Sequence, residues 1–268
     1  VNVGEAGQEV VSDMGSDARR AVDATLARSQ SGPRHDDNIM SLEIELADAA
    51  ATEELGARLA QVVRAGDTIF LRGELGAGKT SLARGFLRRF FADATLDVPS
   101  PSYLISFTYS DAPVPAPPSA GGGGAAAAAG RSVRPVGSSR LPGVSVVHLD
   151  PYRLPEGKVA ALIDLPSIFA SQVSLVEWPE RLGAQLVTET TPARLELRFA
   201  GIGPQARGRT VTMRAVGERW APLVAEWAAA GRVAVELPPL PPPAAAAATS
   251  EAASDDADAG GGASAVAP

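Results

Sequence analysis

The sequence predicts an α/β fold in which helices form the outer two of three layers around a mixed, mainly parallel central sheet. Three observations support this fold class. An apolar run at 68–71 is followed by a glycine-rich loop and by a helical pattern at 81–90. Further strand-like runs alternate with helical stretches, as in sheets covered on both faces. Two alternating runs at 194–199 and 210–216 indicate a terminal antiparallel strand pair.

The same patterns give the order of the elements. Thr52, which is followed by two glutamates, is a predicted helix N-cap, and the apolar face of that helix ends before Gly66. The strand at 68–71, the loop and the second helix come next. The proline-containing stretch 98–103 is an extended lead-in to a strand at 104–109. Strand sequence resumes at 144–150 and 173–177, and a helical stretch covers 218–230.

Low-complexity segments divide the chain. Between Asp111 and Gly130, 18 of 20 residues are Ala, Gly, Pro or Ser, which offers too little apolar bulk to offset the entropy of ordering. We therefore expect a disordered extension at 1–40, a folded domain at 41–217 with a low-complexity insertion at 110–143, a C-terminal helix at 218–236 and a disordered tail at 237–268.

Composition limits the chemistry and the partners. The absence of cysteine removes disulfides, thiol catalysis and cysteine zinc sites, and two distant histidines leave little for a histidine metal site. The net charge of −7 gives no basic footprint, so we expect no direct DNA binding. The sequence contains no apolar run of 18 residues or more, so no membrane span is predicted. We expect a cytoplasmic protein; an arginine-containing stretch at 18–34 leaves the plastid stroma or mitochondrial matrix as alternatives.

The stretch 73–80 reads GELGAGKT and matches the P-loop pattern G-x-x-x-x-G-K-[ST]. Glycines in such a loop let backbone N–H groups surround phosphates, the lysine reaches the β- and γ-phosphate oxygens, and the threonine hydroxyl binds Mg²⁺. The fold class is therefore a three-layer P-loop NTPase fold, and no guanine-selecting NKxD sequence is present, which favours ATP. The expected ATP contacts from this region are Glu74, Gly76, Ala77, Gly78, Lys79, Thr80 and Ser81, with Lys79 also catalytic.

Two acids end predicted strands beside this loop. Asp150 follows Val-Val-His-Leu and Glu177 follows Ser-Leu-Val, and ligands of open α/β sheets gather at the carboxyl ends of their strands. Either acid could bind the metal while the other orients water, and spacing alone does not separate these roles. Trp178 would lie at the same mouth, and Arg84, Arg153 and Arg209 are each able to reach phosphate.

Four motifs together are more specific than the P-loop alone. They are GELGAGKT at 73–80, Ser-Pro-Ser-Tyr at 100–103, His-Leu-Asp-Pro-Tyr-Arg-Leu at 148–154 and Leu-Val-Glu-Trp-Pro at 175–179. In this order they resemble the TsaE family, the bacterial-type ATPases of tRNA threonylcarbamoyladenosine biosynthesis. The resemblance covers roughly residues 42–216. Ser102 stands where the family usually has threonine, which retains the hydroxyl.

The resemblance implies a Mg²⁺-dependent ATPase, slow alone and stimulated by partners, that supports TsaB and TsaD homologues without transferring the carbamoyl group. It would therefore meet tRNA only indirectly. Thr80 and Glu177 would hold Mg²⁺, and Asp150 would be essential for hydrolysis. Thr52 resembles an adenine-side contact, and Gly208-Arg209 resembles a Gly-Arg pair near the nucleotide. The implied switch and partner face consists of Ser100, Pro101, Ser102, Tyr103 and Trp178.

Two other functions fit the P-loop. A small-molecule kinase would use the same phosphate cradle but needs an acceptor pocket and often a lid, for which the insertion is the only candidate. A non-catalytic, nucleotide-dependent adaptor would keep Lys79 and Thr80 and would tolerate the loss of Asp150.

Overall fold

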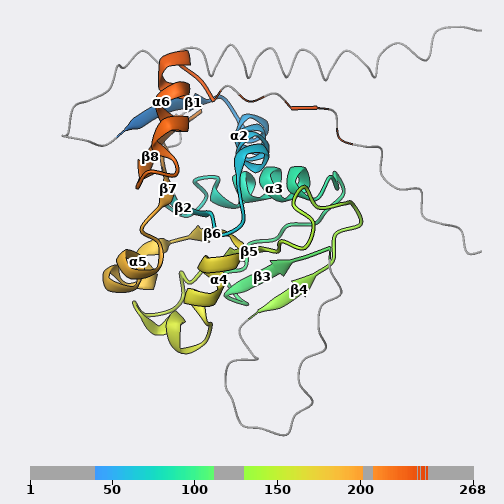
Figure 1. Ribbon diagram of the computed structural model, residues 1–268, viewed down its shortest axis with the longest axis vertical. Helices are drawn as coiled ribbons and strands as arrows, with labels where there is room; N and C mark the ends of the chain where they lie inside the picture. The colour runs from blue at the N-terminus through green and yellow to red at the C-terminus, as the bar shows by residue number, and fades with distance from the viewer. Residues whose placement is uncertain are drawn as a thin grey trace, which may run out of the picture.

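The computed structural model describes residues 40–111, 130–201 and 208–233, together with 235, 237, 238 and 240 (Figure 1). The predicted N-terminal extension, apart from residue 40, and the tail beyond residue 240 lie outside the described residues, as does most of the low-complexity segment. No helix in the described ranges is long and apolar enough to cross a membrane.

The described strands form one eight-stranded sheet with the order β1-β8-β7-β2-β6-β5-β3-β4. Strands β7, β2, β6 and β5 run parallel at its centre, whereas β8 and β1 add an antiparallel end and β3 pairs antiparallel with β5. Their bounds are β1 Ser41–Leu46, β2 Thr68–Arg72, β3 Ser106–Tyr109, β4 Arg131–Val133, β5 Val146–Leu149, β6 Val173–Glu177, β7 Arg194–Ala200 and β8 Arg209–Val216.

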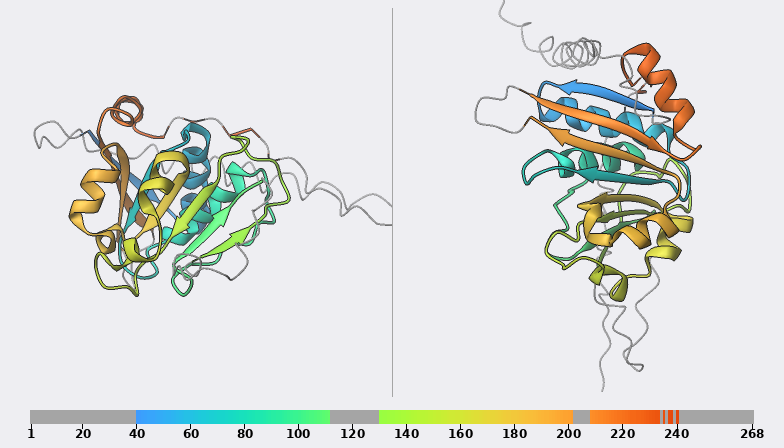
Figure 2. Two further views of the ribbon diagram at one scale, coloured as in Figure 1. Left: turned by 60° about the horizontal axis from the view of Figure 1, so that its bottom comes forward. Right: turned by 90° about the vertical axis from the view of Figure 1, so that its left-hand side faces the viewer.

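Helices cover both faces of this sheet (Figure 2). Because side chains alternate along a strand, β2 sends Ile69 and Leu71 into one apolar cluster and Phe70 into the other. The larger cluster is closed by α2 (Ala49–Val62), α3 (Lys79–Phe90) and α6 (Ala221–Ala230). The smaller cluster is closed by α4 (Leu165–Ser171), α5 (Ala184–Thr190) and the short 3-10 helices η2 (Lys158–Ala161) and η3 (Pro179–Leu182).

The predicted fold class is confirmed: the sheet is mixed, its core is parallel, and β7 and β8 form the expected antiparallel pair. Strand β1 was not predicted, although its sequence alternates and its buried residues are Leu42, Ile44 and Leu46. It pairs with β8 along its whole length. The C-terminal helix is shorter than the predicted 218–236, because it begins at Ala221 and ends with Gly231 as a left-handed C-cap.

Two local predictions are wrong. The N-cap of α2 is Asp48, whose carboxylate accepts the Ala51 N–H at 2.8 Å; Thr52 lies one turn inside the helix. Strand structure was predicted to resume only at 144, but β4 already extends the sheet at 131–133. Its continuation packs on the end of α3, where Arg140 N–H donates to the Phe90 carbonyl at 2.7 Å.

Candidate functional site

The glycine loop joins the end of β2 to the first residue of α3. Gly78 caps α3 in a left-handed conformation with φ of 104°, which favours glycine. No side chain caps this helix, so its first N–H groups face the loop without a side-chain acceptor. A helix N-terminus of this kind carries partial positive charge and binds anions. Strand, loop and helix therefore have the arrangement that the sequence predicts for a phosphate cradle.

Lys79 is folded back onto this loop. Its Nζ donates to the carbonyls of Gly73 at 2.7 Å and Glu74 at 2.8 Å, and it lies 4.3 Å from the ring centre of Trp178. Burial lowers the pKa of Lys79, while Glu177 and Asp150 act in the opposite direction. The ammonium group is thus held at the cradle by carbonyls and an aromatic face, within the reach of two carboxylates' charge.

Glu177 ends β6 directly beside β2. Its Oε1 accepts a hydrogen bond from the Thr80 hydroxyl at 2.7 Å and lies 3.0 Å from His148 Nε2. The Glu177 side chain is almost completely buried. Burial opposes its charge, but the hydrogen bonds from His148 and Thr80 and the nearby Lys79 hold the pKa of Glu177 below its ordinary value. An ionised carboxylate therefore lies against the hydroxyl that follows the P-loop lysine.

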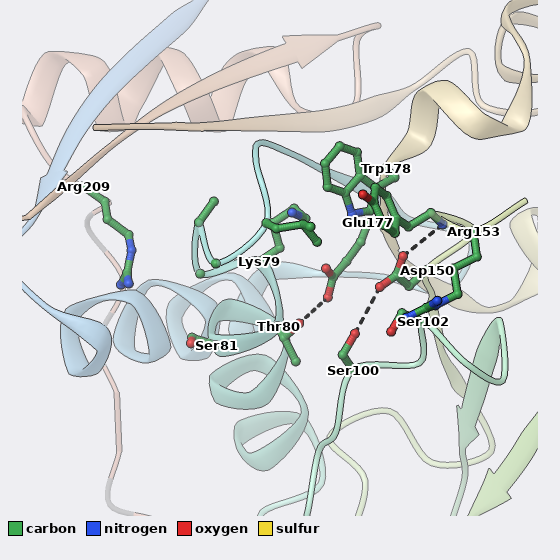
Figure 3. A pocket seen from close by; sticks show the side chains of 15 residues that line it. Lys79, Thr80, Ser81, Ser100, Ser102, Asp150, Arg153, Glu177, Trp178 and Arg209 are labelled. Atoms are coloured by element: carbon green, nitrogen blue, oxygen red, sulfur yellow. Dashed lines mark hydrogen bonds between the residues drawn. The ribbon is translucent and has the colours of Figure 1, made fainter. Parts of the chain in front are cut away.

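Asp150 lies one strand farther from the loop, at the end of β5. Its Oδ2 accepts from the Ser100 hydroxyl at 3.1 Å and its Oδ1 from the Tyr152 N–H at 3.1 Å. Burial and the charge of Glu177 raise the pKa of Asp150. Figure 3 shows both hydrogen-bonded pairs, Ser100 with Asp150 and Thr80 with Glu177, side by side in the same cleft.

The cleft has a volume of about 350 Å³. Most of the predicted site residues line it: Gly76, Ala77, Gly78, Lys79, Thr80, Ser81, Ser100, Ser102, Asp150, Glu177, Trp178 and Arg209. Arg153 also lines it, whereas Arg84 does not and is paired with Glu53 of α2 at 3.1 Å. Five charged side chains and several hydroxyls thus line one cavity beside the glycine loop.

Four predicted residues do not line the cleft. Pro101 is buried, Tyr103 is 81% exposed outside it, and Glu74 is exposed on the loop with its carbonyl bonded to Lys79. Thr52 is fully buried and does not line the cleft, so its adenine contact stays a prediction. Its hydroxyl donates to the Asp48 carbonyl at 2.9 Å and accepts from Arg209 at 3.3 Å. Thr52 therefore contacts the cleft lining only through Arg209 among the described hydrogen bonds.

Arg209 comes from β8 and closes the end of the cleft opposite Asp150 (Figure 3). Its guanidinium lies against the loop so closely that a Cβ on Gly78 would come within 3.3 Å of Nε. The predicted Gly-Arg pair therefore does lie beside the phosphate cradle.

The expected switch and partner face is partly exposed. Tyr103 and Leu104 are exposed beside the cleft, and the Arg153 guanidinium lies 4.1 Å from the Tyr103 ring centre. The Trp178 ring packs on Tyr152 with 4.6 Å between centres. Two backbones here are left-handed without being glycine, Ile105 with φ of 68° and Trp178 with φ of 53°. Such strain concentrates at functional sites.

Sequence reasoning gave no role to His148 or Tyr152, although both belong to the motif that contains Asp150. The signal for His148 was a lone polar residue in the apolar strand Val146–Leu149. Within the described ranges no group of three or more His, Asp or Glu side chains forms a metal site by itself. A hydroxyl and one carboxylate fit Mg²⁺ instead, which takes few protein ligands and completes its octahedron with phosphate and water oxygens.

The chain is similar to several known proteins. Residues 46–116 match the family model described as Threonylcarbamoyl adenosine biosynthesis protein TsaE. The tRNA threonylcarbamoyladenosine biosynthesis protein TsaE of Streptomyces coelicolor is 36% identical over 171 residues, which is 63% of this chain and 93% of that protein. Its counterpart in Mycobacterium leprae is 33% identical over 158 residues, 56% of this chain and 80% of that protein. The crystal structure of Bacillus subtilis YdiB aligns with a TM-score of 0.47 at 22% identity, over 72% of this chain and 97% of that one.

Proposed function

Since the chain belongs to the TsaE family of tRNA threonylcarbamoyladenosine biosynthesis proteins, which are nucleotide-binding P-loop proteins, we propose that it is a Mg²⁺-dependent ATPase of that pathway. The observation that supports this most is the placement of two buried carboxylates with different surroundings beside the glycine loop. One contacts the Thr80 hydroxyl and the other contacts Ser100. Hydrolysis needs a metal anchor and a group that orients water, and these two acids can serve one task each.

The geometry favours one division of these tasks. Glu177 Oε1 lies 2.7 Å from the Thr80 hydroxyl, so these two groups would hold the metal, which would supply positive charge to neutralise the phosphate oxygens of the nucleotide. Lys79 would exchange its loop carbonyls for those phosphate oxygens. Asp150 is a strand farther away and is held at both oxygens by Ser100 and by the Tyr152 N–H. Asp150 would therefore orient the attacking water and accept its proton.

We further propose that the protein acts with homologues of TsaB and TsaD and does not itself transfer the threonylcarbamoyl group. The cleft supports this, because its polar groups would serve phosphates and a metal, and its remaining lining is glycine, alanine, Leu75, Tyr152 and Trp178. The net charge of −7 also supports an indirect role at tRNA. Tyr103 and Leu104 would face a partner from beside the cleft. A cytoplasmic location stays a prediction.

The test is ATP hydrolysis by the purified full chain, alone and with TsaB and TsaD, with Asp150→Asn as the matched variant. We expect slow turnover alone, faster turnover with the partners, and a loss of about 10²-fold or more in the variant, which should still bind nucleotide. Equal turnover with and without partners would contradict the partner role. An Asp150→Asn protein that hydrolyses ATP normally would contradict the site.

The same measurements separate the alternatives. An adaptor without catalysis would support tRNA modification with Asp150→Asn, whereas an ATPase would not. A kinase with the insertion as its lid would lose phosphoryl transfer when the insertion is deleted. Because residues 131–143 pack on the sheet and on Phe90, that deletion should be limited to 112–129.

A further inference from the structure

His148 is a polar residue in the middle of an apolar strand. It lies on β5 opposite Leu175 of β6 and Phe107 of β3, and its side chain is completely buried. Its Nδ1 is buried and has no hydrogen-bond partner among the residues that the structure describes. A buried polar atom without a partner costs about 1–3 kcal/mol, and an apolar side chain of similar volume would avoid that cost. Packing alone therefore gives no reason for histidine at this position.

The other ring nitrogen contacts the carboxylate beside the P-loop. His148 Nε2 lies 3.0 Å from Glu177 Oε1, and the Thr80 hydroxyl lies 2.7 Å from the same oxygen. Since an ionised carboxylate only accepts hydrogen bonds, Nε2 carries the proton and donates it. Among the described residues, both of these hydrogen bonds end on Oε1 and none reaches Oε2. The carboxylate is thus fixed by one of its oxygens and keeps the other available.

We propose that His148 is a positioning residue for Mg²⁺ binding, which fixes the rotation of the Glu177 carboxylate so that it meets the metal correctly beside Thr80. This inference rests on the proposed role of Glu177. His148 itself is buried behind Glu177 and does not line the cleft, so it acts only through that carboxylate. The lowered pKa of Glu177, to which the His148 hydrogen bond contributes, agrees with a carboxylate kept ionised for a cation. Partners of this outer kind change metal affinity by about 10–100-fold when removed.

Two substitutions separate this role from a packing role. His148→Gln places an amide N–H near the position of Nε2 and retains the donor. His148→Leu removes the donor and also removes the unpartnered Nδ1. Should the leucine variant fail to fold, His148→Asn serves in its place, because its amide reaches only as far as Nδ1.

The experiment measures binding of a fluorescent ATP analogue to the full chain at increasing Mg²⁺, without partners and without turnover. We expect His148→Leu to raise the Mg²⁺ concentration at half-maximal analogue binding, the midpoint, by about tenfold or more. The thermal stability of this variant should equal or exceed that of the parent. His148→Gln should return the midpoint most of the way. Glu177→Gln is run in parallel and should also raise the midpoint.

The outcomes are distinguishable. A leucine variant with an unchanged midpoint, while Glu177→Gln raises it, would overturn the positioning role and leave the metal site intact. A leucine variant that is merely less stable, with normal Mg²⁺ dependence, would assign His148 to packing. If Glu177→Gln also leaves the midpoint unchanged, Glu177 does not hold the metal, and the proposed site and this inference both fail.

Discussion

Substituting Gly85 tests how the helix that follows the P-loop is positioned. Helices α2 and α3 cross at two glycines, Gly56 and Gly85. A Cβ on Gly85 would lie 1.9 Å from the Glu53 carbonyl oxygen, and one on Gly56 would lie 2.1 Å from the Leu82 carbonyl oxygen. Because both obstacles are backbone atoms, no side-chain rotation can relieve the contact. Gly85→Ala must therefore separate the two helices.

The size of that shift follows from the contact. To move from 1.9 Å to the 3.4 Å of ordinary contact, the helices must separate by about 1.5 Å. Thr80 is in the first turn of α3 and would move with the helix, so its 2.7 Å hydrogen bond to Glu177 would lengthen toward 4 Å and be lost. A misplacement of about 1 Å at a reacting centre costs about 10²-fold in rate.

The expected loss of stability is similarly defined. Overpacking costs about 1–3 kcal/mol, here at the upper end, and alanine's better helix propensity returns about 1 kcal/mol. The net loss of about 2 kcal/mol should lower Tm by about 4–8 °C in a domain of this size. The assays are thermal unfolding and ATP turnover. Gly143→Ala is the control. Its Cβ would meet nothing within 4 Å, so this variant loses stability only through the left-handed backbone at that position, with φ of 78°. Gly85→Ala with unchanged Tm and turnover would refute the reasoning.

Three further variants test other parts of the site and fold. Lys79→Ala should weaken nucleotide binding by about tenfold or more in a titration, since it removes the charge held at the cradle; unchanged affinity would mean that the octet is not a working P-loop. Arg209→Ala should also weaken binding without lowering Tm by more than about 3 °C; equal affinity would exclude Arg209 from the nucleotide site. Burial opposes the charge of Asp93, but hydrogen bonds from Thr95 and the Val136 N–H hold its pKa below the ordinary value. Its contribution to stability is therefore present above about pH 4 and lost as pH falls through the folded pKa. The Tm difference between the parent and Asp93→Ala should be full at pH 7 and shrink toward pH 3, and a constant difference would contradict the assignment.

The parts of the fold that could be predicted are those encoded locally. The strand, loop and helix around Lys79 occupy consecutive residues, and the required left-handed cap at Gly78 is written in the sequence as glycine. The missed strand β1 is different, because its one partner among the described strands is β8, far along the chain. Its alternation was visible, but six residues of alternation become a strand only when a neighbour supplies the other half of the hydrogen bonds.

Thr52 shows how a helix register controls a functional assignment. Thr52, followed by two glutamates, has the sequence expected of a helix N-cap. Asp48, four residues earlier, is also of a residue type that commonly caps helices. The structure uses Asp48, which moves Thr52 by one turn into the helix, buries it and directs its hydroxyl to Arg209. The sequence alone does not predict which of these two residues caps α2, because the start of the helix depends on where β1 ends and how α2 packs on α3.

The two acids could be found but not distinguished from sequence, and the reason lies in the strand order. Both follow apolar strands, and the register places Leu149 beside Val176 and Leu71 beside Glu177, so both acids emerge at the same edge of the sheet. Their difference is lateral: β6 adjoins β2 and its P-loop, whereas β5 is one strand farther out. Neighbouring strands lie about 4.8 Å apart, so that single step separates a carboxylate that touches Thr80 from one that does not. Spacing along the sequence does not reveal which strand lies next to β2, so the division of tasks that we propose for Glu177 and Asp150 rests on the assembled sheet.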